Sequence, residues 1–341
     1  MKALQITEPH HSEIVKIPQP SPAPGEVLLQ IRKIGFCGSD LATFQGHNPL
    51  VNYPRIPGHE ISATISAVTS GVPEMLVSGM KVTVVPYTNC GACASCRRGR
   101  FHACRFNQTL GVQRDGALTE FLAVPWQKVI VAPGLSDVQL ALVEPLTVGF
   151  HAVDRGRVEA EDAVLVFGCG MIGLGAIAGA LYRKSRVIAV DIDDAKLSIA
   201  RRIGAAHTIN SKSGDLHQQL QALTSGHGPD VVVEAVGSPL TYRTAVEVVA
   251  FAGRVVYIGY SKEEVSFATK LFVQKELDIL GSRNATAADF ERVTRYLAES
   301  RFPVSDVVSR TVSPEQAGEA LSAWSSNPGA YTKILVELDV N

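Results

Sequence analysis

Hydrophobic positions in the first 150 residues form short runs separated by glycine and proline. Strand-like runs occur at 26–35 (EVLLQIRKIG), 61–71 (ISATISAVTSG), 81–87 (KVTVVPY) and 118–124 (LTEFLAV). Short strand-like runs with turn residues between them are typical of all-β units. The pattern therefore predicts a mostly β, barrel-like first domain.

From about residue 160 the pattern alternates between apolar strand-like runs and segments with helical periodicity, such as 193–205 (DDAKLSIARRIGA). The apolar runs lie at 163–167, 186–190, 230–235, 253–258 and 277–280, with a weaker one at 206–209. Strands that alternate with helices predict an α/β fold with a doubly wound, parallel sheet, here of six strands.

One apolar stretch, from Ala163 to Tyr182, carries no charge and is long enough to cross a bilayer. Glycines at 168, 170, 173 and 175 divide it into a short run, a turn and a second run. We therefore expect a buried strand that enters a buried helix rather than a membrane span.

The last part of the chain contains a helical segment and then one further strand-like run. Residues 285–300 have a helical pattern, and 331–338 (YTKILVEL) form a strand-like run that comes too late for the six-stranded set. We expect this strand to join the first domain. The expected domains are thus 1–150 with 285–341, and 151–284.

Composition and charge narrow the function classes. The 341 residues include 32 Lys and Arg against 33 Asp and Glu. This balance argues against a dedicated nucleic-acid or membrane-surface binder, which usually carries a basic excess. The N-terminal residues show no apolar run of the secretory type, so we expect a cytoplasmic protein.

Four of the six cysteines fall within fifteen residues, CGACASCRRGRFHAC. Four thiolates complete a tetrahedral zinc shell and leave no position for water or substrate, so such a site should be structural. An iron–sulfur cluster also uses four cysteines, but the Cys-Pro that ends the ferredoxin-type run is absent. Four free thiols are the remaining alternative. The candidate ligands are Cys90, Cys93, Cys96 and Cys104, and the arginines among them are expected to face solvent.

A glycine-rich turn lies between the strand and the helix expected near 163–182. Gly168, Gly170 and Gly173 have the GxGxxG spacing that binds a pyrophosphate at a helix N-terminus. Asp191 ends the next strand-like run, where a carboxylate binds the ribose hydroxyls and repels a 2′-phosphate. The pattern predicts NAD rather than NADP. The alternative for Asp191 is a helix cap.

Three further segments contain residues of the kinds that bind metal ions, but none of them supplies a complete set of four ligands. They are GFCGSD with Cys37, PGHE with His59 and Glu60, and VEPL with Glu144. Each has a plain alternative: a buried cysteine, a capped turn and an acid at a helix start. Together they offer the three protein ligands of an open, catalytic zinc site.

These motifs give the chain a resemblance to the medium-chain, zinc-dependent alcohol and polyol dehydrogenases. GFCGSD, PGHE, the four-cysteine segment, EPLTVGFHA, FGCGMIGLGAIAGA and VVEAVG occur in the order of that family and cover nearly the whole chain. CGSD, GHNP, NYPRIPGHE and ELDILGSRNA are most similar to the branch that acts on polyols and sugar acids, which includes sorbitol, galactitol and L-galactonate dehydrogenases.

The resemblance implies a GroES-like catalytic, zinc-binding domain, a Rossmann domain, two Zn²⁺ ions per chain and NAD. Cys37, His59 and either Glu144 or Glu60 would bind the catalytic zinc, and Ser39 would take the proton of the alcohol. Glu60 would ligate in the resting state or exchange with water during turnover. The implied substrate is a small polyol or sugar acid, and the implied assembly is a homodimer or homotetramer. The further cofactor contacts would be Met171, Ile172, Val236, Ile258 and Arg283.

Two positions leave the mechanism open. Many relatives carry a histidine where this chain has Ala42, and His47 is a possible substitute in the proton path or a pocket-wall residue. Arg283 could meet a substrate carboxylate, or brace its own loop. Reduction of aldehydes or ketones, and a non-catalytic zinc- and nucleotide-binding regulator, are the alternative functions.

Overall fold

The computed structural model describes residues 1–300 and 302–338, which form two compact units. Unit 1 contains Met1–Glu144, Thr286–Ser300 and the residues from Val304 onward, and unit 2 contains Pro145–Ala285 with Phe302 and Pro303. The expected division at residues 150 and 284 stays a prediction about where the catalytic and dinucleotide-binding functions separate.

Unit 1 is mostly β. Its strands are β1 (Lys2–Glu8), β2 (His11–Lys16), β3 (Glu26–Phe36), β4 (Glu60–Val68), β5 (Lys81–Val84), β6 (Phe121–Pro125), β7 (Val129–Val131), β14 (Val308–Val312) and β15 (Lys333–Glu337). Its helices are α1 (Gly38–Phe44), α8 (Ala287–Glu299), α9 (Val304–Val307) and α10 (Ala317–Ser326), with short 3-10 turns η1 (Cys96–Arg98), η2 (Phe101–Ala103), η3 (Trp126–Lys128), η4 (Pro314–Gln316) and η5 (Pro328–Ala330).

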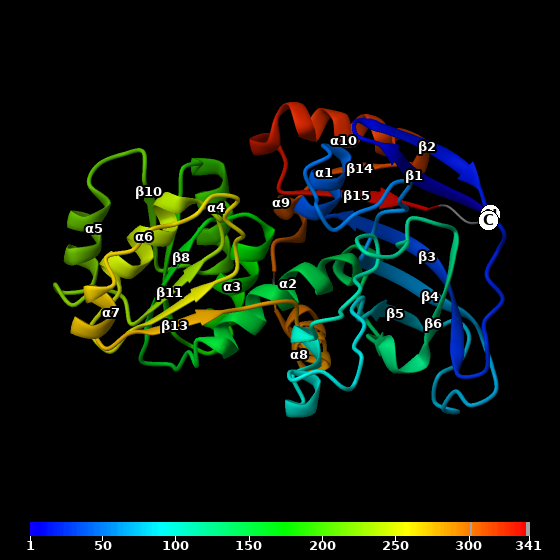
Figure 1. The fold of residues 1–341 in the computed structure, drawn as a ribbon, viewed down its shortest axis with the longest axis horizontal. Coiled ribbons are helices and arrows are strands. Elements are labelled where there is room, and N and C mark those ends of the chain that lie inside the picture. Colours follow the sequence, from blue (N-terminus) through cyan, green and yellow to red (C-terminus); the bar gives the residue numbers. More distant parts are fainter. Residues whose placement is uncertain (301, 339–341) are drawn as a thin grey trace. The chain divides into compact units, whose positions relative to one another are not determined.

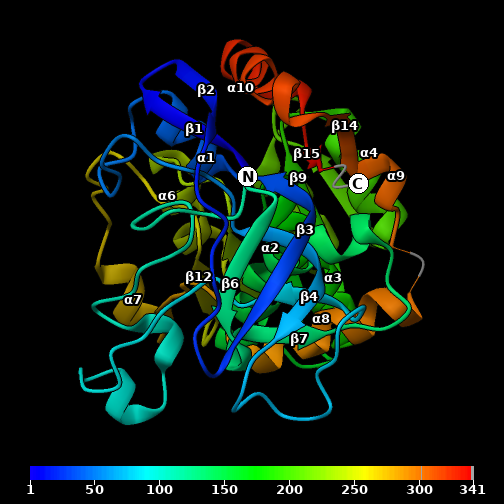
Figure 2. The ribbon, with the colours of Figure 1, turned by 90° about the vertical axis from the view of Figure 1, so that its right-hand side faces the viewer.

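Strand β3 organises the seven-stranded sheet of unit 1. The order is β14-β15-β3-β4-β5-β7, and β6 pairs with β3 outside this path. Figure 2 shows β3 beside β6 and β4, with which it pairs antiparallel. β3 has three neighbours because it is eleven residues long: β4 pairs along most of its length, β6 pairs with residues 26–30, and β15 pairs with residues 33–36.

The late strand returns to this sheet, as the sequence predicts. β15 pairs antiparallel with β3, with Ile334 opposite Phe36, and parallel with β14. The first and last parts of the chain therefore lie side by side, blue and red in Figure 1.

Two details of unit 1 differ from the sequence prediction. The antiparallel pair β1–β2 was not predicted, because β2 has no buried residue and the buried residues of β1, Ala3, Leu4 and Ile6, form no clear apolar run. The run at 118–124 becomes a strand only from Phe121, because the amides of Ala117 and Leu118 bond to the carbonyls of Gly58 and Pro57 instead of a sheet ladder.

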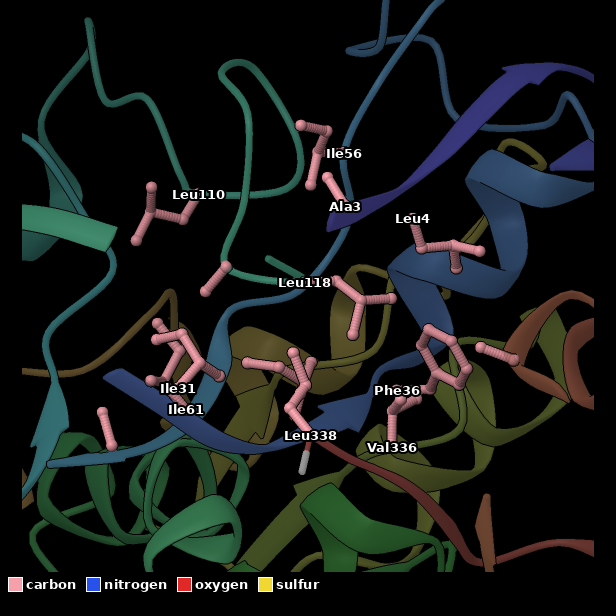
Figure 3. Packing of buried hydrophobic residues seen from close by; sticks show 14 of the residues in the cluster. Ala3, Leu4, Ile31, Phe36, Ile56, Ile61, Leu110, Leu118, Val336 and Leu338 are labelled. Atoms are coloured by element: carbon pink, nitrogen blue, oxygen red, sulfur yellow. The ribbon is translucent and has the colours of Figure 1, made fainter. Parts of the chain in front are cut away.

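The core of unit 1 joins residues from distant parts of the sequence (Figure 3). Figure 3 shows Ala3 and Leu4 from β1, Phe36 from β3, Leu118 from the loop before β6 and Val336 from β15. Each is less than a tenth exposed, so the sheet that carries the candidate site is stabilised by hydrophobic burial along its length.

Unit 2 has the predicted doubly wound sheet. Its strands are β8 (Ala163–Phe167), β9 (Arg186–Asp191), β10 (His207–Asn210), β11 (Val231–Glu234), β12 (Arg254–Tyr257) and β13 (Asp278–Gly281), in the order β10-β9-β8-β11-β12-β13. All neighbouring pairs are parallel. Its helices are α3 (Met171–Tyr182), α4 (Asp194–Ile203), α5 (Leu216–Leu223), α6 (Pro239–Val248) and α7 (Lys270–Gln274), and α2 (Asp137–Arg155) passes from unit 1 into unit 2.

The uncharged stretch that begins at Ala163 folds as a five-residue strand followed by the twelve-residue helix α3. This confirms the expectation of a buried strand entering a buried helix. Within residues 1–300 and 302–338, no helix has both the length and the apolar character that a bilayer span requires.

Candidate active site

Cys37 lies at the junction of β3 and α1. Its backbone is extended (φ −96°, ψ 160°), and its N–H donates a hydrogen bond to Oδ2 of Asp40 at 2.9 Å. A helix start leaves amides without partners, and a side-chain acceptor close by fixes the turn. Asp40 is completely buried, so the position of the Cys37 backbone is set by the interior of the protein.

His59 and Glu60 lie where β4 begins. The preceding residue, Gly58, has φ +102° and donates its N–H to Oδ1 of Asp40 at 3.3 Å. Nδ1 of His59 lies 4.0 Å from the same oxygen. Asp40 therefore links the segment of Cys37 to the segment of His59, which are far apart in the sequence.

The ligand atoms of Cys37, His59 and Glu60 all lie within 4.8 Å of one another. Nδ1 of His59 is buried and has no hydrogen-bond partner in the described part of the chain. Burial disfavours charge on this ring, but Asp40, Cys37 and Glu144 outweigh it and hold the pKa of His59 well above its ordinary value. The imidazole thus lies among groups that favour positive charge.

Glu144 lies in α2 and is 4% exposed. Its Oε1 accepts a hydrogen bond from the hydroxyl of Tyr87. Burial, with a contribution from Glu60, raises the pKa of the Glu144 carboxyl, and burial together with Glu144 raises the pKa of Tyr87. Among the described residues, Glu60 rather than Glu144 completes the group of ligand atoms around Cys37 and His59.

The carboxylate of Glu60 is completely buried and pairs with the buried ammonium of Lys333 on β15. Nζ of Lys333 lies 2.6 Å from Oε1 of Glu60, also contacts Oε2, and donates to the carbonyl of Phe36 at 2.9 Å. A Cβ atom at Gly35 would lie 2.0 Å from Oε2 of Glu60. The pair therefore requires glycine at position 35.

Three buried carboxyl groups, Asp40, Glu60 and Glu144, lie around Cys37 and His59, and Lys333 is the buried ammonium that pairs with Glu60. Buried carboxylates need positive charge nearby. Without a metal, Lys333 and the imidazole of His59 supply it, and a divalent cation held by Cys37, His59 and Glu60 would take the place of the His59 proton. The donor set of thiolate, imidazole and carboxylate fits Zn²⁺.

Of the two residues predicted to carry the substrate proton, Ser39 has its hydroxyl buried beside the Cys37 segment and His47 lies at the surface. Oγ of Ser39 is buried and has no hydrogen-bond partner in the described chain, while its carbonyl accepts from Thr43 at 2.8 Å. His47 is exposed, and no hydrogen bond joins its ring to Ser39 within residues 1–300 and 302–338. Ala42 is half-buried.

The four clustered cysteines converge in unit 1. Sγ of Cys93 lies 3.5 Å from Sγ of Cys96 and 3.9 Å from Sγ of Cys104, and the sulfurs of Cys90 and Cys96 are 4.0 Å apart. A tetrahedral zinc ion with Zn–S bonds of about 2.3 Å holds its sulfurs about 3.8 Å apart. The spacing fits a closed zinc shell.

The surroundings favour the thiolates of Cys90 and Cys93, whereas burial and the neighbouring thiols raise the pKa of Cys96 to about 11. The hydroxyl of Ser95, with the amides of Cys96 and Arg105, lowers the pKa of Cys93 to about 5. The amide of Cys93 donates to the sulfur of Cys90 at 3.3 Å. The arginines lie at the surface, as expected: Arg97 binds the carbonyl of Ala92 at 2.7 Å and Arg105 stacks on Phe106.

The glycine-rich turn of unit 2 has the geometry that its spacing predicts. Gly168 has φ +90°, and a Cβ at Gly173 would lie 1.8 Å from the carbonyl oxygen of Gly168. Gly170 precedes α3, and a Cβ there would meet no atom within 4 Å. The turn thus needs glycine for conformation at 168 and for packing at 173, and it leaves open space at 170, where a pyrophosphate would approach the helix N-terminus.

Asp191 ends β9 beside this turn. Its Oδ2 accepts from the N–H of Cys169 at 2.6 Å, and its Oδ1 accepts from the N–H of Ile192 at 2.7 Å and of Asp193 at 3.0 Å. Asp193, not Asp191, caps α4 with its side chain. Burial raises the pKa of the Cys169 thiol, which agrees with a packing role for this cysteine.

The other expected cofactor contacts lie in unit 2. Met171 is buried and Ile172 half-buried at the start of α3, Val236 is 52% exposed after β11, Ile258 follows β12, and Arg283 is half-buried after β13. All five positions follow the carboxyl ends of parallel strands, where ligands bind in open α/β sheets.

The sequence prediction assigned no role to four residues that organise the sites, although Asp40 stands out in the GFCGSD segment. Asp40, Tyr87 and Lys333 hold the groups around Cys37 and His59, as described above. Glu234 is buried in β11; its Oε1 accepts from the N–H of Val236 at 2.9 Å, and its carbonyl accepts from the N–H of Ile258 at 2.9 Å. A charged residue inside an apolar run was the available signal for Glu234 and Lys333.

Comparisons with known proteins agree with this arrangement. The alcohol dehydrogenase GroES-like domain matches residues 23–134, and the zinc-binding dehydrogenase domain matches residues 172–299. The chain is 34% identical to L-galactonate-5-dehydrogenase of Escherichia coli over 83% of each chain.

Two solved structures from E. coli cover the whole fold. Galactitol-1-phosphate dehydrogenase has a TM-score of 0.92 and 28% identity, over 99% of this chain and 100% of that one. A short chain alcohol dehydrogenase (rspB) complexed with NADH has a TM-score of 0.91 and 30% identity, over 99% of both chains.

Proposed function

Because this chain belongs to the medium-chain, zinc-binding alcohol dehydrogenase family, we propose that it is an NAD-dependent dehydrogenase that oxidises a secondary alcohol of a polyol or sugar acid. The family and its two-domain α/β fold confirm the resemblance predicted from the sequence. The observation that carries the proposal is the convergence of the thiol of Cys37, the imidazole of His59 and the carboxyl group of Glu60, whose ligand atoms lie within 4.8 Å of one another in a largely buried group.

We assign the catalytic metal to Cys37, His59 and either Glu60 or Glu144, and the structural metal to the four clustered cysteines. A zinc ion at the catalytic position would act as a Lewis acid that lowers the pKa of a substrate hydroxyl. Three neighbouring residues would position the metal ligands. Lys333 neutralises Glu60, Tyr87 orients Glu144, and Asp40 holds the segments of Cys37 and His59 together.

Ser39 is our candidate for receiving the hydroxyl proton of the substrate. Its Oγ is buried beside the Cys37 segment and makes no hydrogen bond within the described residues, so an acceptor is available for an incoming hydroxyl. The onward path through His47 stays a prediction, and its exposed position makes it the weakest member of the set.

We assign NAD to the glycine-rich turn and Asp191 of unit 2. NAD would accept the hydride, and the protein would supply position and electrostatics. The open space at Gly170 supports an approach of the pyrophosphate to α3, and the carboxylate of Asp191 supports binding of the ribose hydroxyls. Glu234 holds the backbone of Val236 and Ile258, which we place beside the nicotinamide half.

Names of the relatives support the substrate class. L-galactonate-5-dehydrogenase and galactitol-1-phosphate dehydrogenase act on a sugar acid and on a phosphorylated polyol. The expected cytoplasmic location and homodimeric or homotetrameric state stay predictions. The strand β13, which ends the sheet order of unit 2, is the edge where we expect subunits to meet, and a light-scattering mass of one 36.5 kDa chain would refute this assembly.

The direct test is a substrate panel run in both directions. Zinc-loaded protein should reduce NAD with at least one polyol or aldonate, followed by NADH absorbance, and Cys37→Ser should abolish this turnover. A protein that reduces simple aldehydes or ketones with NADH, but oxidises no polyol or aldonate, would instead support the reductase alternative.

A further inference from the structure

A loop of unit 1, residues 109–116 (TLGVQRDG), is fixed against the segment that precedes His59. A Cβ atom at Gly111 would lie 2.6 Å from the amide nitrogen of Gly58, and one at Gly116 would lie 2.4 Å from the carbonyl oxygen of Pro57. Within the loop, the side chain of Gln113 accepts a hydrogen bond from the amide of Thr109 at 2.8 Å. The backbone of Arg114 is therefore held in place.

Arg114 has no acceptor for its guanidinium in residues 1–300 and 302–338. Its Nε is buried without a hydrogen-bond partner, and its side chain forms no ion pair there. The adjacent acid, Asp115, is engaged elsewhere: its Oδ1 accepts from Arg55 at 2.9 Å and from the amide of Ile56 at 3.1 Å. A partly buried guanidinium that lacks an acceptor is an energetic cost that the folded protein carries.

A second cation, Lys128, is held against a segment that pairs with the loop of Arg114. Tyr87, whose carbonyl binds Lys128, forms a β-bridge with Thr109, and Leu110 forms one with Arg114. Lys128 is half-buried, and its Nζ donates to the carbonyl of Tyr87 at 2.7 Å. No carboxylate pairs with it in the described part of the chain. Burial lowers the pKa of both side chains, and the charge of Arg114 lowers the pKa of Lys128 further. The two positive charges therefore repel each other in a place where water shields them incompletely.

Both cations are attached to segments that hold the candidate zinc ligands. The loop of Arg114 packs on Pro57 and Gly58, directly before His59. Lys128 binds the backbone of Tyr87, whose hydroxyl binds Glu144. Neither cation neutralises the acids of the zinc group; that contact is made by Lys333.

We propose that Arg114 and Lys128 form an anion subsite that receives the carboxylate or terminal phosphate of an acidic substrate. This inference rests on the proposed dehydrogenase function and adds the feature of the substrate that the protein would select. The guanidinium can bind a carboxylate or phosphate through two parallel hydrogen bonds, and the ammonium adds a point charge. The anion would supply the acceptor that Arg114 lacks and remove the repulsion between the two cations.

The test compares three six-carbon compounds, sorbitol, gluconate and sorbitol 6-phosphate, together with their stereoisomers. Arg114→Gln removes the charge, and Arg114→Lys keeps it but loses the planar fork. Lys16→Gln is the matched control, because Lys16 is exposed and its loss changes the net charge equally.

Arg114→Gln should raise KM for the best acidic substrate roughly 10- to 100-fold, because the variant loses one charged hydrogen bond to the anion. KM for the neutral polyol should change less than about twofold, because the polyol makes no such bond. Arg114→Lys should show a smaller rise, and Lys16→Gln none. The melting temperature should stay the same or rise, because the Arg114 side chain has no partner among the described residues and its loss removes the repulsion with Lys128. Which acidic compound shows the dependence on Arg114 identifies carboxylate or phosphate.

Equal changes in KM for acidic and neutral substrates, or no change for acidic ones, would overturn the subsite and leave the dehydrogenase proposal standing. If the wild type oxidises none of these compounds, the proposed function fails first. Thermal shift with gluconate and with inorganic phosphate then decides the subsite: stabilisation of the wild type but not of Arg114→Gln supports it, and equal shifts in both refute it.

Discussion

Replacing Lys333 by methionine tests the charge arrangement around Glu60. The pair is almost completely buried, with 2% of the Lys333 side chain and 0% of the Glu60 side chain exposed. Removing one partner of a buried pair leaves the other charge uncompensated and typically costs about 3–5 kcal/mol. For a unit of this size, we expect the melting temperature to fall by about 6–20 °C.

The assay is thermal unfolding of metal-free and zinc-loaded protein. Zinc should reduce the loss caused by Lys333→Met, because the released carboxylate can then face the metal charge. The double variant Lys333→Met/Glu60→Gln should recover much of the stability, since it removes both charges. Lys2→Met is the control: Lys2 and Glu315 are both more than half exposed, so we expect about 0–1 kcal/mol.

Two results would refute this reasoning. A Lys333→Met variant that melts like the wild type when metal-free would mean that the Glu60 carboxylate is not charged in the folded protein. A double variant that is as unstable as the single one would mean that Lys333 acts through its bond to the carbonyl of Phe36 rather than through Glu60.

Three further predictions concern the metals, the cofactor and the substrate. A chelator should remove the catalytic zinc before the structural zinc, so activity should fall before structure does. In the same way, Cys37→Ser should mainly abolish turnover, whereas Cys93→Ser should harm folding or solubility. Elemental analysis that finds one tightly held metal in a fully active enzyme would contradict two sites. Asp191→Ala should raise KM for NAD roughly tenfold, as expected for one lost charged hydrogen bond, and narrow the preference over NADP; better turnover of NADP by the wild type would contradict the role of Asp191. Arg283 is the alternative partner for the substrate carboxylate: if it, rather than Arg114, binds that group, Arg283→Lys should raise KM for an aldonate more than for a polyol, and equal losses on both would indicate a structural role.

Local pattern was enough to predict unit 2. Its central strands β8, β9, β11 and β12 are largely buried and form continuous apolar runs. The spacing of Gly168 and Gly173 predicts the tight turn between β8 and α3. The β1–β2 pair was missed because β2 is exposed or half-buried throughout and β1 buries only Ala3, Leu4 and Ile6, so neither strand has the apolar run that marks a sheet strand.

The candidate site was predictable in its ligand types and not in its supporting contacts. Cys37, His59 and Glu60 follow recognisable local motifs. Lys333, by contrast, binds Glu60 across 273 positions, and Tyr87 binds Glu144 across 57. Such contacts depend on which strands become neighbours in the folded sheet, and a single sequence contains no direct measure of that pairing.

The return of β15 to β3 sets an order for synthesis on the ribosome. Unit 2 is nearly continuous in sequence, so its sheet can form as soon as its residues have emerged. The sheet of unit 1 cannot close until Lys333 reaches Phe36, 297 positions upstream. Until then β3 keeps an unpaired edge, and the Glu60 carboxylate lacks the cation that neutralises it. A chain whose translation stops before β15 should therefore expose both defects to chaperones and proteases, so that incomplete copies are removed before they can compete for zinc.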